Sequence, residues 1–309
     1  MLTSRQKNIA LIILKVAIVC FAVYSVGNSL HTFFVTKQGF ELVMQNLSTN
    51  KVMLFVVVLL MPLNWLTEAQ KWRIIAGRSE KISLWKSLTG VLAGLATGAA
   101  TPNRSGEFAG RILALNQTDF KDGVVLTFFS SAVQVIVTVL AGAFGLLYFR
   151  NHTLLTNHTL HFAVMICVCI VLFLAAFLFL KSKRAEDKLS VLKQLDRALL
   201  LEAGLWSALR YCIYTCQFFI LLRVTGFPCT STALLAAIAV NYLVITIIPT
   251  FMISEVFVRG SVAAGVIGVL CGNGETAALC ALLSWLLNVG VPALAGAIAV
   301  VRMRINQSL

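Results

Sequence analysis

Long apolar stretches separated by short polar segments dominate the pattern of hydrophobic and polar positions along this chain. A bilayer core about 30 Å thick is crossed by about 20 apolar residues in helical conformation. Stretches long enough to cross are Ile9–Leu30, Val124–Tyr148, Leu160–Leu180, Leu200–Leu222 and Ala277–Val301. A shorter one, Val52–Leu66, continues through Trp72 as a helix with an amphipathic end. The pattern therefore predicts six membrane-crossing helices.

Two further apolar stretches, Leu84–Leu115 and Thr232–Leu270, are interrupted in the middle by a proline and charged residues. The interruptions are residues 101–107 and 249–255. Because proline ends or kinks a helix, each stretch is expected to bend there. Each is therefore predicted to form a hairpin of two shorter helices.

The lysines and arginines between the apolar stretches predict the orientation of the chain. They concentrate near the N-terminus, in Lys71–Lys86, in Lys181–Arg197 and in the tail. The other flanks hold only Lys37, Lys51, Arg150 and Arg223. Because positively charged loops stay in the cytoplasm, both termini are expected there. The first hairpin must then enter and return on the cytoplasmic side, and the second on the outer side.

Residues 1–150 and 151–309 show the same order of predicted elements, namely crossing, crossing, hairpin, crossing. Three crossings place the second copy upside down, which is the inverted repeat of many transporters. Glu107-x-x-x-Arg111 and Glu255-x-x-x-Arg259 occupy the same place in the two halves. The predicted fold is an all-α polytopic membrane protein, a single integral membrane domain over 1–309. It has about six full crossings plus two re-entrant broken-helix hairpins.

Composition excludes a soluble globular protein. Hydrophobic residues make up 59% of the chain and charged residues 12%, against about 45–50% and about 25% in soluble domains. The net charge of +13 would suggest nucleic acid in a soluble protein, but topology explains these basic residues, so no nucleic-acid partner is expected. The eight cysteines lie within or beside apolar stretches, without CxxC or zinc spacing. They are interpreted as buried small hydrophobes, and neither a disulfide framework nor a metal or cofactor site is expected.

The charged residues near the hairpin tips are the candidate functional residues of this chain: Arg104, Glu107, Arg111, Glu255 and Arg259. Each costs at least about 2.5–3.5 kcal/mol inside the membrane, so pairing or function must offset the cost. A Glu and an Arg four residues apart share one helical face, and pairing between the two hairpins is the alternative. One hypothesis is that these carboxylates and guanidinium groups form structural ion pairs that join the two tips. The other is that the tips bind an anionic headgroup through helix N-termini and arginines. The two hypotheses are compatible.

Other polar residues lie deep within the predicted crossings. Arg210 is about ten residues into its stretch, too deep to reach the surface easily, which favours a cavity-lining role. A structural pair with Glu68 is the alternative. Amides inside crossings more often join helices by hydrogen bonds than touch substrate, and this interpretation applies to Gln134, Gln217, Asn241 and Asn288. Small residues in Gly90–Gly98 and around Gly296 predict close helix packing.

Residues 102–111, Pro-Asn-Arg-Ser-Gly-Glu-Phe-Ala-Gly-Arg, resemble the P-x-R-x-G-E-x-x-x-R signature of the lysylphosphatidylglycerol synthase transmembrane region, or flippase-like, family. Residues 64–72 are similar to that family's stretch ending in a charged residue and Trp, and residues 249–255 resemble its second element. The resemblance implies an integral membrane protein that moves lipids between leaflets. It makes these residues the candidate substrate site: Pro102, Arg104, Gly106, Glu107, Arg111 and Glu255. The reasoning from the residues adds Ser105, Arg210 and Arg259.

Two departures from the family pattern refine the expectation. The segment Thr250–Ser254 stands where the family tends to have glycines, which argues against an identical headgroup. The chain ends at Leu309, without the soluble aminoacyl-transferase domain, so lysyl transfer is not expected.

The leading hypothesis is a lipid translocase that binds a phosphate-bearing membrane lipid, located in a bacterial cytoplasmic (inner) membrane. The alternative is a proton-coupled secondary transporter of a small anion, in which a buried Glu carries the proton. The chain lacks GxSxG, HExxH and paired intramembrane Asp, so an enzyme is not expected.

Overall fold

The computed structural model describes residues 45–46, 48–99, 101, 106–116, 118–150, 195–248 and 252–307. These residues fold into helices and the turns between them. Two predicted crossings, Ile9–Leu30 and Leu160–Leu180, lie outside the described residues. The same holds for the proline segments at the tips of both predicted hairpins, residues 102–105 and 249–251.

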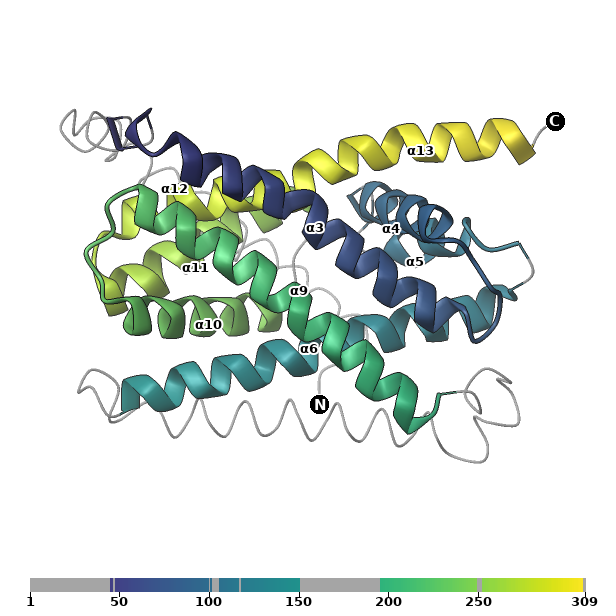
Figure 1. The fold of residues 1–309 in the computed structure, drawn as a ribbon, viewed down its shortest axis with the longest axis horizontal. Helices are drawn as coiled ribbons and strands as arrows, with labels where there is room; N and C mark the ends of the chain where they lie inside the picture. Colours follow the sequence, from purple (N-terminus) through teal and green to yellow (C-terminus); the bar gives the residue numbers. More distant parts are fainter. Residues whose placement is uncertain are drawn as a thin grey trace, which may run out of the picture.

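Three long helices run along the molecule: α3 (Lys51–Ala76), α6 (Phe120–Arg150) and α9 (Arg197–Val224). In Figure 1, α3 and α9 run diagonally and α6 lies below them. A fourth path is formed by α12 (Gly274–Trp285), the π-helical segment η3 (Leu286–Gly290) and α13 (Val291–Gln307). Among the described residues, these four segments and Ser254–Cys271 are the five that are long enough and apolar enough to cross a membrane. The structure therefore confirms an all-α polytopic membrane protein.

The helix α9 shows how the sequence distributes polar and apolar side chains. Its start is capped by Asp196, whose side chain accepts a hydrogen bond from the backbone N–H of Leu199. Leu201 and Leu205, four residues apart, are 70% and 72% exposed on its outer face. Ser207 on another face is fully buried. Apolar side chains outside and polar side chains inside suit a helix that meets lipid on its outer face.

Two pairs of shorter helices occupy opposite ends of the molecule (Figure 1). One pair is α4 (Leu84–Ala99) with α5 (Gly106–Ile112), and the other is α10 (Ser231–Ile247) with α11 (Met252–Cys271). This placement agrees with the two hairpins expected from opposite sides. The stretch Ser254–Cys271 of α11 is long enough to cross by itself, so re-entry of this pair stays a prediction, as does the inverted repeat.

Glycines bring α4 close to two neighbouring helices, as the small-residue pattern predicted. A Cβ on Gly94 would lie 3.0 Å from the backbone oxygen of Glu107 in α5. On the other side of α4, a Cβ on Gly296 of α13 would overlap the backbone oxygen of Leu92. Backbones therefore approach each other directly at both contacts, which small residues permit inside membranes.

Four of the cysteines differ from the interpretation as buried small hydrophobes: Cys212 and Cys216 are exposed on α9, and two others are cross-linked. Cys229, between α9 and α10, forms a disulfide with Cys271 at the end of α11, with Cα atoms 5.3 Å apart. The interpretation as buried small hydrophobes without a further role is therefore wrong for this pair. Cys280 is a buried free thiol, as expected.

The contact between α13 and α4 gives a stability prediction. Gly296→Ala should lower the stability by about 1–3 kcal/mol, because the added methyl group overlaps the backbone of Leu92, which cannot rotate away. The measurement is the thermal midpoint of the purified protein in detergent. Gly265→Ala is the matched control, since a Cβ there meets nothing within 4 Å. Equal midpoints for the two variants would contradict the close approach.

Candidate functional site

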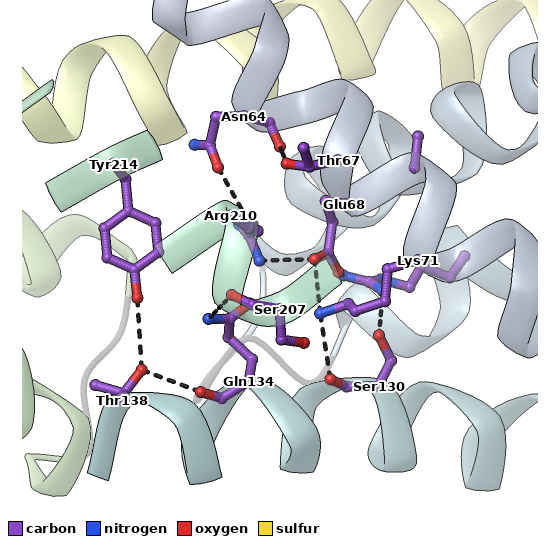
Figure 2. A network of polar contacts seen from close by, with 12 residues as sticks. Asn64, Thr67, Glu68, Lys71, Ser130, Gln134, Thr138, Ser207, Arg210 and Tyr214 are labelled. Carbon is purple, nitrogen blue, oxygen red and sulfur yellow. Dashed lines mark hydrogen bonds and ion pairs between the residues drawn. The ribbon is translucent and has the colours of Figure 1, made fainter. Parts of the chain in front are cut away.

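A single carboxylate on α3, that of Glu68, is surrounded by three cations. Its oxygens lie 2.8 Å from Lys71 Nζ, 2.8 Å from Arg111 Nη2 and 2.8 Å from Arg210 Nη1. Figure 2 shows its side chain between the cationic groups that approach it from α3 and α9. Glu68 is 3% exposed and Lys71 1%, so these charges lie away from the molecule's surface. Burial of such charges is tolerated only when they are paired and hydrogen-bonded.

A second carboxylate completes this group of charges. Glu107 Oε1 lies 2.6 Å from Arg111 Nη2, one helical turn away on α5. The guanidinium of Arg111 also lies 5.5 Å from the centre of the Trp72 ring, within the range of a cation–π contact. Lys71 donates a further hydrogen bond of 3.3 Å to the backbone oxygen of Ser130 on α6. The charged cluster (Glu68, Lys71, Glu107, Arg111 and Arg210) thus joins α3, α5, α6 and α9.

A chain of amide hydrogen bonds extends from the charged cluster. Arg210 Nε donates to Asn64 Oδ1 at 3.1 Å, and Asn64 Nδ2 donates to Asn288 Oδ1 at 2.6 Å. Asn288 Nδ2 in turn donates to Gln217 Oε1 at 2.6 Å. Asn288 lies in η3, and π-helical turns often occur at functional sites. The prediction that amides join helices by hydrogen bonds is confirmed for Asn288 and Gln217. It is also confirmed for Gln134, whose Nε2 donates to the Ser207 backbone oxygen at 3.3 Å.

Two cavities lie against these groups. The charged cavity, of about 170 Å³, is lined by all five members of the charged cluster together with Trp65. The aromatic cavity, of about 210 Å³, is lined by Arg210, Arg259, Tyr214, Tyr242 and Trp285 among others. Both cavities share Arg210 and the amides Asn64, Gln134 and Asn288. Arg210 is therefore placed where the two cavities adjoin.

The family of the chain follows from comparison of its sequence with known families. Residues 12–302 match the model of the lysylphosphatidylglycerol synthase TM region. The chain belongs to this family. No curated protein and no solved structure matches it. The charged cluster described above is thus the polar interior of a lysylphosphatidylglycerol synthase TM region.

Four of the candidate site residues lie together in this family member. Gly106 begins α5 and donates its N–H to Thr101 Oγ1 at 2.6 Å, while Glu107 and Arg111 follow on the same helix. Arg210 approaches them from α9. It lines the cavity and pairs with Glu68, so the two roles considered as alternatives for Arg210 occur together. Pro102, Arg104 and Ser105 lie outside the described residues.

The remaining candidates, Glu255 and Arg259, form a separate pair on α11. Arg259 Nη2 lies 2.7 Å from Glu255 Oε1, and Arg259 lines the aromatic cavity. Each hairpin Glu therefore pairs with the Arg one turn later on its own helix. This is the first of the two arrangements considered from the sequence, and the ion pairs described here do not link the two hairpins.

Sequence reasoning left two central residues out of the candidate site. Glu68 entered only as a partner for Arg210, and Lys71 was assigned to a cytoplasmic loop. A signal for both was present, because Asn64, Glu68 and Lys71 are spaced by four and three residues and so share one helical face. The position of Lys71 at the end of an apolar stretch hid this signal, since basic residues there are typical of loops.

The charged cluster gives the second prediction. Glu68→Gln should destabilise the protein by about 3–5 kcal/mol, because it removes the anion shared by the buried cations Lys71 and Arg111 and by the half-buried Arg210. Arg78→Gln is the control, since it breaks an exposed pair with Asp196 and should cost less than about 1 kcal/mol. The thermal midpoints of both variants in detergent measure this difference. A Glu68→Gln protein as stable as the Arg78→Gln protein would show that the cluster does not hold the helices together.

Proposed function

We propose that this protein is a transporter, not an enzyme, that moves a phosphate-bearing lipid between membrane leaflets. The headgroup occupies the charged and aromatic cavities while the acyl chains stay in the bilayer. Membership of the lysylphosphatidylglycerol synthase TM family, a membrane domain related to lipid metabolism, supports a lipid substrate. The observation that carries the proposal is the charge of the site.

The charged cluster has an excess of positive charge. It contains three cations and two carboxylates, which leaves a net formal charge of +1. The Glu255–Arg259 pair adds no net charge. A net charge of the described residues in a membrane interior is costly, and a bound monoanion removes it. A phosphodiester carries one negative charge and accepts hydrogen bonds from guanidinium groups in a bidentate geometry.

The position of Arg210 fits a site halfway across the membrane. Arg210 is the fourteenth of the 28 residues of α9. At 1.5 Å per residue, it lies about 20 Å from either end of this helix. A headgroup bound there lies equally far from both ends of this membrane-crossing helix, as the proposed translocation intermediate requires. An anion at Arg210 also competes with Glu68 for the same guanidinium, which couples its binding to the charged cluster.

The two ends of the molecule differ in a way that supports the expected orientation. The end where α3 stops carries Arg73, Arg78, Lys81 and Lys86. The Cys229–Cys271 disulfide joins the end of α11 to the loop after α9, at the opposite end (Figure 1). Basic residues favour the cytoplasm and disulfides persist in oxidising compartments. The proposed location is a bacterial inner membrane, with the disulfide on the outer side and both termini in the cytoplasm.

A reconstitution experiment tests the transport proposal. Proteoliposomes containing fluorescent phosphatidylglycerol or phosphatidylethanolamine are assayed by bleaching of the outer-leaflet label. The wild-type protein should move at least one of these lipids faster than protein-free liposomes do. Arg210→Gln should lower the rate at least tenfold, about 1.4 kcal/mol of barrier, because the central guanidinium is lost. Arg223→Gln, near the end of the same helix, is the control and should retain the rate.

The same preparation separates the proposal from the alternative transporter. Arg210→Gln and wild-type proteoliposomes are compared only after both proteins elute as single symmetric peaks. Unchanged lipid movement in Arg210→Gln contradicts the proposed site. Phosphate uptake driven by a pH step and abolished in Glu255→Gln, without lipid movement, would establish the proton-coupled anion transporter instead.

The orientation gives its own prediction. In intact cells, a membrane-impermeant maleimide should label Glu275→Cys, near the disulfide, and should label Lys121→Cys only after permeabilisation. The wild-type protein corrects for its native thiols, of which Cys212 and Cys216 are exposed in the structure. The reverse pattern of labelling would invert the proposed orientation.

A further inference from the structure

The aromatic cavity differs in charge from the charged cavity beside it. Its charged lining residues are Arg210 and Arg259, and no Asp or Glu is among the described residues that line it. Both arginines are about a quarter exposed, against 4% for Arg111, so they are the more accessible guanidinium groups. An ammonium group that entered this cavity would face two like charges, and no carboxylate among the described lining residues would bind it.

The other lining groups of the aromatic cavity are neutral hydrogen-bonding side chains and aromatic rings. Amides and hydroxyls come from five helical elements: Asn64, Gln134, Thr138, Thr246, Ser284 and Asn288. The rings of Tyr214 and Tyr242 contact each other edge to face, with centroids 4.9 Å apart. The buried indole Nε1 of Trp285 donates to no acceptor among the residues that the structure describes. Such a donor is costly to leave unmatched, and a ligand oxygen would match it.

From these groups we infer that the aromatic cavity takes a hydroxyl-bearing phosphodiester headgroup without an ammonium group. The phosphate lies at Arg210 and Arg259, and the hydroxyls meet the amides, side-chain hydroxyls and indole N–H. This inference rests on the proposed lipid transport and names the substrate class of that site. A cavity of about 210 Å³ is small, which suits a compact polyol phosphate.

The balance of charges in the site favours the same class of headgroup. The charged cluster and the Glu255–Arg259 pair together contain four cations and three carboxylates, a net charge of +1. A phosphatidylglycerol-type headgroup brings this sum to zero. A zwitterionic headgroup leaves it at +1, and a lysyl ester of phosphatidylglycerol, with two ammonium groups, raises it to +2. The site thus favours the unmodified anionic lipid over the aminoacylated lipid in the name of its family.

A binding experiment tests the headgroup class independently of transport. The purified full-length protein in a neutral detergent is titrated with short-chain phosphatidylglycerol, phosphatidylethanolamine and lysylphosphatidylglycerol, and the thermal midpoint is followed. Phosphatidylglycerol should raise the midpoint at a concentration at least tenfold lower than the other two lipids require. Glycerol phosphate is titrated in parallel. An equal effect of glycerol phosphate identifies a soluble polyol phosphate as the ligand and overturns the lipid assignment.

Two conservative variants locate the binding within the aromatic cavity. Trp285→Phe retains the ring and removes the N–H, and Arg259→Lys retains the charge and removes the guanidinium fork. Each should raise the half-saturating concentration of phosphatidylglycerol at least threefold. Trp85→Phe and Arg223→Gln are the matched controls, because Trp85 is 75% exposed on α4 and neither residue lines the cavity. These two variants should bind as the wild type does.

The outcomes of the binding and transport assays separate the two proposals. Equal or tighter binding of phosphatidylethanolamine or lysylphosphatidylglycerol overturns the headgroup class, even where the reconstituted protein moves lipid. Loss of binding in the control variants but not in Trp285→Phe overturns the assignment to this cavity. Selective binding of phosphatidylglycerol without lipid movement supports the headgroup class and contradicts the transport function.

Discussion

The carboxylate of Glu68 is the group on which the arrangement of the polar interior depends. Three cations from α3, α5 and α9 approach it to 2.8 Å in surroundings that are almost closed to solvent. Without that carboxylate, the positive charges of Lys71, Arg111 and Arg210 would repel one another at short range in a medium of low dielectric constant. Their mutual attraction to one anion fixes α5 and α9 relative to α3, which lipid-facing apolar surfaces cannot do by themselves, since lipid tails are as apolar as the helices.

The amide chain carries this arrangement from the ion pairs to the last helical path. Asn64 accepts from Arg210 and donates to Asn288, so one side chain on α3 links α9 with η3. The π-helical turn adds a residue to the helix at this point and presents Asn288 where α12 gives way to α13. Arg210 is the only cation among the described residues that lines both cavities, and the two side chains to which it donates, Glu68 and Asn64, belong to the same helix. A change at either cavity therefore acts on α3 through this guanidinium and through Asn64, which lines both cavities.

The four predicted crossings that lie among the described residues could be found from the sequence because they depend on the length of apolar stretches, which is a local property. The prediction that Val52–Leu66 continues through Trp72 as one helix is confirmed, and α3 runs four residues further, to Ala76. The polar interior depends instead on which helix faces meet, and apolar length says nothing about that. Lys71 shows the consequence: its position at the end of a stretch suggested a loop, while its place on the Glu68 face of α3 puts it inside. Cys229 and Cys271 show it too, because 42 residues separate them and only the fold brings them to 5.3 Å.

The two Glu-x-x-x-Arg pairs illustrate how similar local sequences acquire different roles. Both pairs form within one helical turn, as the spacing requires. Arg111 is also held by Glu68 and lies against Trp72, and α5 packs so closely on Gly94 that the pair has little room to open. Arg259 is instead a quarter exposed and lines the aromatic cavity. The guanidinium with more protein partners is the less suited to a ligand, because every partner must be displaced or shared when an anion binds. On this physical ground the first pair serves to fix the helices, and Arg259 and Arg210 are the groups through which the cavity meets its ligand.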